Sequence, residues 1–188
     1  MGKYYTTKES VEEYIRMAQG HDGSKHILKL KKFLPPGASV LEIGSGPGTD
    51  WKILNKYYTV TGSDKSAEFL KHLRYTFPKG DFLSLDASSL IIEQNFDGIY
   101  SNKVLHHLED EALEASVRRQ TEILNSGGIV CHTFWKGVDF ELYNDLFINY
   151  HTEKGLRTLF QLDFETLLIQ HYREFEKDDS LLYIGKKA

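Results

Sequence analysis

The chain alternates between short apolar runs and longer stretches in which apolar residues recur at helical spacing. Between residues 37 and 135, runs rich in strand-forming residues occupy positions 40–43, 59–63, 82–85, 98–100 and 129–134. Stretches with helical character separate them, at positions 50–56, 66–77, 88–93 and 110–124. Strands that alternate with helices in this rhythm predict a parallel sheet with helices on both faces.

The two ends of the chain follow other patterns. Ser10 and Glu13 have the spacing of a capping box, which predicts a first helix from Ser10 to about Ala18, and a second helix is expected from Ser24 to just before Pro35. Positions 164–172 and 181–184 read as strands joined by a short polar segment, which predicts an antiparallel hairpin. The predicted fold class is therefore α/β: a doubly wound, mostly parallel seven-stranded sheet closed by a C-terminal antiparallel hairpin, in a single domain of residues 1–188.

The sequence LEIGSGPGTD, at positions 41–50, follows the first strand of that sheet and carries glycines at every second position, Gly44, Gly46 and Gly48. Ligands bind at the carboxyl ends of parallel strands, and glycine lets a ligand approach the backbone closely. A tight turn without a ligand is the simpler interpretation of one glycine, but three in this context favour a ligand. The dinucleotide fingerprint would need glycine where Thr49 stands, and a P-loop would need a lysine after the glycines.

Glu42, Gly44, Gly46 and Gly48 form the pattern E-x-G-x-G-x-G, which resembles the first motif of the class I S-adenosylmethionine-dependent methyltransferases. Further similarity to small single-domain members of this family, of the kind that act on small molecules, continues from about Gly37 to the C-terminal hairpin. The resemblance implies a Rossmann-like methyltransferase fold and S-adenosyl-L-methionine as cofactor. It also implies methyl transfer by in-line displacement to a small-molecule acceptor.

The same resemblance assigns roles to individual residues. Glu42 is expected to hold the ammonium group of the cofactor, Asp64 the two ribose hydroxyls and Asp86 the adenine amino group. The two oxygens of a carboxylate suit the vicinal diol of a ribose on chemical grounds as well, although Asp64 could instead be only a helix cap. The cofactor-binding residues implied in this way are Glu42, Gly44, Ser45, Gly46, Gly48, Asp64, Lys65, Asp86, Ala87, Ser101, Asn102 and His107.

Three histidines are candidates for a catalytic base. His106 and His107 follow the fourth strand of the predicted sheet, and His132 lies on the fifth. The alternatives are a helix entry for the pair and a satisfied core position for His132.

Aromatic residues near both ends of the chain are candidates for a substrate wall and lid. Tyr143, Phe147 and Tyr150 recur at i, i+4 and i+7, which predicts one face of a helix, with core packing as the alternative. The chain then divides into N-terminal helices forming the lid (1–36), a cofactor-binding core (37–135), an insertion at the substrate site (136–162) and the C-terminal hairpin (163–188). The expected wall and lid residues are Tyr4, Tyr5, Tyr14, Trp135, Tyr143 and Phe147.

The composition of the chain limits the classes of binding partner that are expected. The net charge of −4 disfavours nucleic acid, and the single Cys131 excludes an intramolecular disulfide framework. With no long apolar run and no signal peptide, the chain is expected to be cytoplasmic, a monomer or homodimer, without a membrane partner. No residues are assigned to a metal. Two alternatives stay open: a non-catalytic cofactor-binding or regulatory protein of the same fold, and a methyltransferase acting on RNA or protein.

Overall fold

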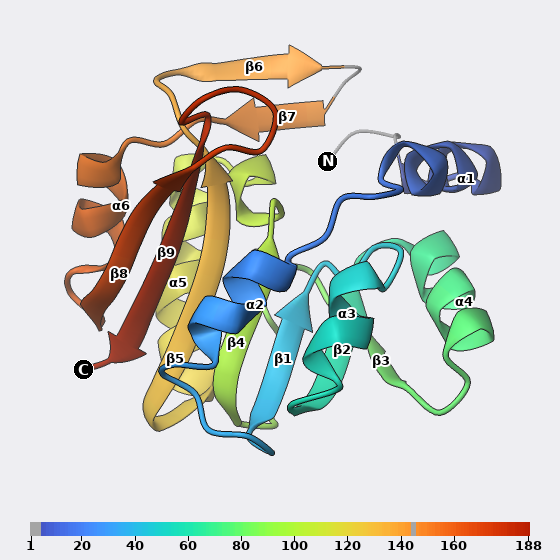
Figure 1. Cartoon of the computed structure of the whole chain (residues 1–188), viewed down its shortest axis with the longest axis horizontal. Helices are drawn as coiled ribbons and strands as arrows, with labels where there is room; N and C mark the ends of the chain where they lie inside the picture. Colours follow the sequence, from blue (N-terminus) through green and yellow to red (C-terminus); the bar gives the residue numbers. More distant parts are fainter. Residues whose placement is uncertain (1–4, 144–145) are drawn as a thin grey trace.

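A seven-stranded sheet forms the centre of the molecule (Figure 1). The computed structural model describes residues 5–143 and 146–188. Within these ranges the strand order is β3-β2-β1-β4-β5-β9-β8; the first five strands are parallel, and β9 and β8 are antiparallel to their neighbours. This confirms the predicted fold class. The strands of this sheet are β1 (Ser39–Ile43), β2 (Thr59–Asp64), β3 (Asp81–Ser84), β4 (Phe96–Asn102), β5 (Leu124–Trp135), β8 (Phe164–Tyr172) and β9 (Ser180–Lys187).

Helices cover both faces of the sheet. α2, α3 and α4 pack on one face, and α5 and α6 pack on the other, while α1 lies beyond the carboxyl ends of the strands beside α4 (Figure 1). This is the doubly wound arrangement, in which both faces of the parallel strands are buried. The helices are α1 (Lys8–Met17), α2 (Ser24–Leu30), α3 (Thr49–Leu54), α4 (Ala67–Thr76), α5 (Asp110–Ile123) and α6 (Glu153–Phe160), with a 3-10 turn at Leu105–His107.

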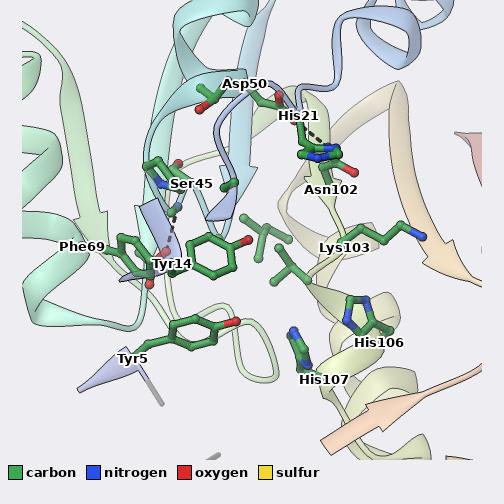
Figure 2. Close-up of a pocket in the computed structure, with 18 of the residues that line it drawn as sticks. Tyr5, Tyr14, His21, Ser45, Asp50, Phe69, Asn102, Lys103, His106 and His107 are labelled. Atoms are coloured by element: carbon green, nitrogen blue, oxygen red, sulfur yellow. Dashed lines mark hydrogen bonds between the residues drawn. The ribbon is translucent and has the colours of Figure 1, made fainter. Parts of the chain in front are cut away.

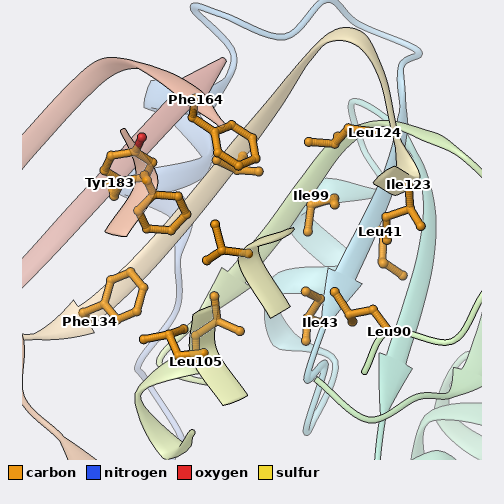
Figure 3. Close-up of a cluster of buried hydrophobic side chains, with 14 of the residues drawn as sticks. Leu41, Ile43, Leu90, Ile99, Leu105, Ile123, Leu124, Phe134, Phe164 and Tyr183 are labelled. Carbon is orange, nitrogen blue, oxygen red and sulfur yellow. The ribbon is translucent and has the colours of Figure 1, made fainter. Parts of the chain in front are cut away.

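Each face of the sheet has its own hydrophobic cluster. On the α5 and α6 face, Phe160 stacks on Tyr183 with ring centroids 4.0 Å apart and meets Phe164 edge-on. Figure 3 shows Tyr183 and Phe164 of this cluster together with Leu41 and Ile43 of β1. On the opposite face, Trp51 of α3 lies against Phe82, with centroids 4.9 Å apart. The two clusters pack on opposite faces of β1 and β4 and so fix the carboxyl ends of these strands.

The insertion after β5 differs from the prediction. Residues 140–149 form a β-hairpin in which β6 (Phe140–Tyr143) pairs antiparallel with β7 (Leu146–Asn149). Tyr143 pairs with Leu146 and Leu142 with Phe147, so Tyr143 and Phe147 lie on opposite faces. The prediction that these residues share one helix face is therefore wrong. Aromatic residues favour strands as much as this spacing favours a helix, and cross-strand pairing decides between the two.

Two smaller predictions also need correction. The first helix is capped by Thr7 rather than Ser10, because the Thr7 hydroxyl accepts from the backbone N–H of Ser10 at 3.2 Å and the helix begins at Lys8. Residues 88–93 form a turn and irregular chain rather than a short helix. There the carboxylate of Asp86 accepts from the Ser88 backbone, a local bond that competes with helix formation.

In the part of the chain that the structure describes, no helix combines the length and the apolar character needed to cross a lipid bilayer.

Candidate active site

A cavity of about 420 Å³ opens at the carboxyl ends of the parallel strands. It lies beside β1, whose neighbours β2 and β4 continue the sheet in opposite directions, which is the switch point where α/β folds bind ligands. Two regions of its wall differ in character. We call them the polar half, formed by Glu42, Gly44, Ser45, Gly46, Asp50 and Asp64, and the aromatic half, formed by Tyr5, Tyr14, Trp135, Tyr143 and Phe175.

The three glycines after β1 have different structural roles. Each has positive φ, but a Cβ at Gly44 would lie 2.6 Å from Val104 and one at Gly48 would lie 2.5 Å from Phe77, so these two glycines leave room for neighbouring side chains. A Cβ at Gly46 would meet nothing within 4 Å, and Gly46 lines the cavity. Gly46 is thus the position where the backbone is bare toward a ligand, whereas Gly48 does not line the cavity.

Glu42 is a buried carboxylate at the floor of the polar half. Its Oε2 accepts from the Ser45 hydroxyl at 2.5 Å. Burial, together with the charges of Asp50 and Asp64, raises the pKa of Glu42 to about 8. A buried acid with other carboxylates close by is stabilised in its charged form by a cation, so this floor suits a ligand with a positive group.

Asp64, at the end of β2, is held by backbone N–H groups on both sides. Its Oδ2 accepts from Gly46 at 3.0 Å and its Oδ1 from Ser66 at 2.8 Å. Burial raises the pKa of Asp64, while these bonds oppose the shift. A carboxylate offers about four acceptor positions, so Asp64 keeps capacity for two hydroxyl donors. It also serves as the turn residue before α4, so the binding and structural interpretations are both compatible with its position.

Lys65, Asp86 and Ala87 lie at the rim of the polar half. Lys65 and Ala87 line the cavity, but Asp86 does not. The Asp86 carboxylate pairs with the Lys65 ammonium through Oδ2 and with Ser88 through Oδ1. Partial burial raises the pKa of Asp86, but these hydrogen bonds outweigh it and hold the pKa at about 2. Lys65 is therefore paired with the acid that was expected to receive adenine.

Of the residues predicted around β4 and β5, Asn102 faces the cavity and two others lie in the core. Ser101 is fully buried and bonds to His132 Nδ1 at 2.8 Å, and His132 Nε2 bonds to Gln120 at 2.8 Å. Burial lowers the pKa of His132 to about 3. With both ring nitrogens engaged away from the cavity, His132 occupies the core position that the sequence left open as the alternative to a catalytic base.

His106 and His107 both line the cavity (Figure 2). The Nδ1 of His107 meets the Phe147 carbonyl oxygen at 2.8 Å, and since a carbonyl only accepts, this nitrogen carries the proton and Nε2 the lone pair. His106 is 2% exposed, and its Nδ1 has no hydrogen-bond partner among the described residues. Burial lowers the pKa of both histidines, that of His106 to well below its ordinary value, so both are neutral at pH 7.

Aromatic side chains from distant parts of the chain form the rest of the wall. Tyr5, Tyr14 and Phe69 make a ring cluster with centroids 5.3–5.7 Å apart, on the side of the cavity opposite His106 and His107 (Figure 2). Trp135 stacks on Phe175 at 5.8 Å. Phe147 does not line the cavity, since it lies on the outer face of the hairpin, and Tyr4 falls outside the described residues.

Sequence reasoning missed several polar residues of the wall, among them Asp50, Lys103 and Glu174. Lys103 has φ of 55° and places its ammonium 3.4 Å from the centre of the Trp135 ring, where it donates to Phe134 O and Ser180 Oγ. Burial lowers the pKa of Lys103 to about 7, although the negative charges of Glu174 and Asp179 act in the opposite direction. Its partners come from β5 and β9, so only the folded chain reveals its role. Among residues 5–143 and 146–188, no group of acids, histidines and cysteine is arranged to hold a metal ion.

Comparison with known proteins places these features in a family. Residues 40–128 match a family model described as a methyltransferase domain. An uncharacterized methyltransferase of Bacillus cytotoxicus is 32% identical over 56% of this chain and 51% of its own length. The trans-aconitate 2-methyltransferase of Azoarcus sp. is 27% identical over 54% of this chain and 41% of its own. The chain spans about half the length of these curated relatives.

Solved structures share the fold over nearly the whole chain. The 1,6-didemethyltoxoflavin-N1-methyltransferase of Burkholderia thailandensis superposes with a TM-score of 0.80 at 20% identity, covering 96% of this chain and 84% of that one. The N-methyltransferase NodS of Bradyrhizobium japonicum gives 0.75 at 16% identity, covering 100% and 99%. Both were solved with S-adenosylhomocysteine. Residues 40–128 therefore form a class I S-adenosylmethionine-dependent methyltransferase domain, the family that the motifs of this chain resemble.

Proposed function

We propose that this chain transfers a methyl group from S-adenosylmethionine to a small organic acceptor held against the aromatic half of the cavity. The observation that carries the proposal is the continuity of one cavity from the polar half to the aromatic half. A methyl donor in the polar half and an acceptor in the aromatic half would meet in the same cavity. The names of two similar proteins, which refer to trans-aconitate and to 1,6-didemethyltoxoflavin, support an acceptor of small size.

The residues of the polar half fit this cofactor. The bare backbone at Gly46 leaves room for it, Glu42 and Asp50 supply negative charge for its ammonium group, and Asp64 has acceptor capacity for its ribose hydroxyls. Lys65 and Ala87 form the rim expected for the adenine end. When bound, the cofactor supplies a methyl group already activated by the sulfonium charge.

The chain's own contribution to the reaction is then positioning and exclusion of water. Tyr5, Tyr14 and Tyr143 approach from segments outside the sheet, while Trp135 and Phe175 cover the β5 side. Apolar walls of this kind suit a flat or apolar molecule and keep competing water from the reacting atoms. Holding the two reactants in line can account for a large part of the rate enhancement.

His106 and His107 are the two candidate bases that reach this space. Since both are neutral at pH 7, each can accept a proton or a hydrogen bond from an acceptor whose own pKa is low enough. The Nε2 lone pair of His107 is fixed by the bond of its Nδ1 to Phe147 O. We assign these two histidines to orienting the acceptor and taking up its proton where it carries one.

The test is a screen for release of S-adenosylhomocysteine. The chain would be incubated with S-adenosylmethionine and, in separate arms, pools of small aromatic and carboxylic compounds, total tRNA, and unfolded protein. Turnover with a small-molecule pool is expected. Turnover confined to tRNA or protein would contradict the proposed acceptor class, and cofactor binding with no turnover in any arm would favour a regulatory cofactor-binding protein.

A further inference from the structure

The carboxylate of Asp50 joins three segments that the sequence keeps far apart. Asp50 is the second residue of α3 and is 9% exposed. It accepts from the Gly23 backbone N–H at 2.6 Å, from the Tyr100 hydroxyl at 2.8 Å and from the Asn102 amide at 2.9 Å. Figure 2 draws Asp50 and Asn102 at the same edge of the cavity. Three donors from the α1–α2 connection and from β4 therefore depend on one side chain.

Gly23 is required at this junction for reasons of space. A Cβ there would lie 2.1 Å from the Tyr100 hydroxyl and 2.5 Å from Asp50 Oδ2. Its φ is −84°, which any residue can adopt, so backbone conformation is not what selects glycine. The absence of a side chain lets the backbone come within hydrogen-bond distance of Asp50.

The residues before Gly23 form one side of the cavity. Tyr5, Tyr14, Met17, Ala18, His21 and Asp22 all line it, and we call them the N-terminal wall. At its far end this wall is held by the Ser66 hydroxyl, which donates to Tyr5 O at 2.6 Å, and by the contact of the Tyr5 and Tyr14 rings with Phe69. At its near end it is held by the bond from Gly23 to Asp50.

Both attachments of the wall lead to carboxylates of the polar half. Ser66, which holds Tyr5, donates its backbone N–H to Asp64. Asp50 itself lines the cavity, and its charge acts on buried Glu42. The wall that faces the acceptor is thus anchored on the same groups that face the cofactor.

We propose that Asp50 is a positioning residue that fixes the N-terminal wall over the polar half, through Gly23, and so sets the position of the acceptor. This rests on the proposed methyl transfer only for its kinetic consequence. The anchoring itself is a property of the chain and is measurable without any reaction.

The first experiment measures exchange of the Gly23 amide hydrogen by NMR in the full chain. In Asp50→Asn one side-chain oxygen must serve three donors, so Gly23 exchange is expected to accelerate by roughly tenfold or more, the range for losing a bond to a charged group. Tyr100→Phe removes a different donor and is expected to change Gly23 exchange by less than about threefold. Val130, buried in β5, reports global stability and should keep its protection in both variants.

Unchanged Gly23 exchange in Asp50→Asn would overturn the proposal, as would equal acceleration at Gly23 and Val130, which would show general loosening. If Asp50→Asn does not fold, Gly23→Ala replaces it, since the added Cβ displaces the wall from the same junction. Gly23→Ala should then accelerate exchange at Ala18 and His21 but not at Val130, and protection unchanged at those two amides would overturn the proposal.

A second experiment applies once an acceptor is known. Gly23→Ala, which replaces no residue of the cavity wall, is expected to raise the KM for the acceptor by about tenfold with a change in kcat of less than about threefold, because the wall is displaced while the residues of the polar half are unchanged. A fall in kcat at unchanged KM would overturn the positioning role. If no acceptor is turned over at all, the proposed function fails while the exchange result still decides the anchoring.

Discussion

The two halves of the cavity are built in opposite ways. The polar half comes from short loops that leave parallel strands, and its side chains are held by nearby backbone, as Asp64 is by Gly46 and Ser66. The aromatic half comes from the N-terminal segment, the end of β5, the β6–β7 hairpin and the loop between β8 and β9, which meet only in the folded molecule. Tyr143 is 59% exposed, whereas Glu42 is 2% exposed. The first half is formed locally at the ends of buried strands, while the second is an assembly of segments that are distant in the sequence.

This difference suggests that the two halves have separate functions, one in binding the cofactor and the other in binding the acceptor. Loops anchored on a buried sheet can hold a common ligand in one geometry, and exposed segments can change without disturbing the core. Substitutions in the polar half should therefore act on cofactor affinity, with Asp50 as the exception because it also holds the N-terminal wall, and substitutions in the aromatic half should act on the acceptor. Each prediction below tests one side of that separation.

The largest effect is expected for Gly46→Val. A side chain at this position would project into the cavity, so affinity for S-adenosylhomocysteine should fall by on the order of 100-fold, about 2.7 kcal/mol. The matched control is Gly37→Val. Gly37 also has positive φ and open space around its Cβ position but does not line the cavity, so it carries the same backbone strain without the obstruction. Titration calorimetry on both variants decides, and equal loss in the two would place the cofactor elsewhere.

Asp64→Ala comes next. Loss of hydrogen bonds to a charged group should weaken binding of S-adenosylhomocysteine by about 1.5–3 kcal/mol, roughly 10- to 150-fold. Asp86→Ala is the comparison, because Asp86 already pairs with Lys65 and Ser88 and does not line the cavity. We expect the smaller effect there. A larger loss in Asp86→Ala would reverse the assignment of the two acids.

Tyr143→Ala tests the aromatic half. It removes a ring that lines the cavity from an exposed strand, so the KM for the acceptor should rise roughly three- to tenfold, about 0.6–1.4 kcal/mol for one partly exposed contact, at unchanged cofactor affinity. Leu142→Ala is the control, since Leu142 is 69% exposed on the outer face of the same strand. Steady-state kinetics should show no change for this control, and a matching rise would argue that the hairpin rather than the ring is responsible.

The smallest effect concerns protons. Because burial and nearby acids raise the pKa of Glu42 to about 8, this group is mostly protonated at pH 7 in the free chain. A bound ammonium favours the ionised form, so binding should release a fraction of a proton at pH 7, and affinity should rise with pH until about pH 8. Calorimetry in two buffers with different ionisation enthalpies measures this release. Glu42→Gln should reduce it, and an identical release in that variant would assign the proton to another group.

What could be predicted from sequence follows the same division. The glycines, Glu42 and Asp64 lie within or just after single strands, so local pattern suffices to place them, and the strand and helix rhythm predicts the sheet. The role of Asp50 depends on Gly23, Tyr100 and Asn102, which are near it only in three dimensions. The helix predicted for residues 143–150 failed because a spacing of aromatic residues does not encode which strand they pair with.

The central claim is that the polar half binds S-adenosylmethionine and not a nicotinamide nucleotide. Titration calorimetry of the wild-type chain with S-adenosylhomocysteine and, separately, NADH tests it directly. The account predicts saturable one-to-one binding of S-adenosylhomocysteine and no measurable heat with NADH. Micromolar binding of NADH without binding of S-adenosylhomocysteine would contradict it.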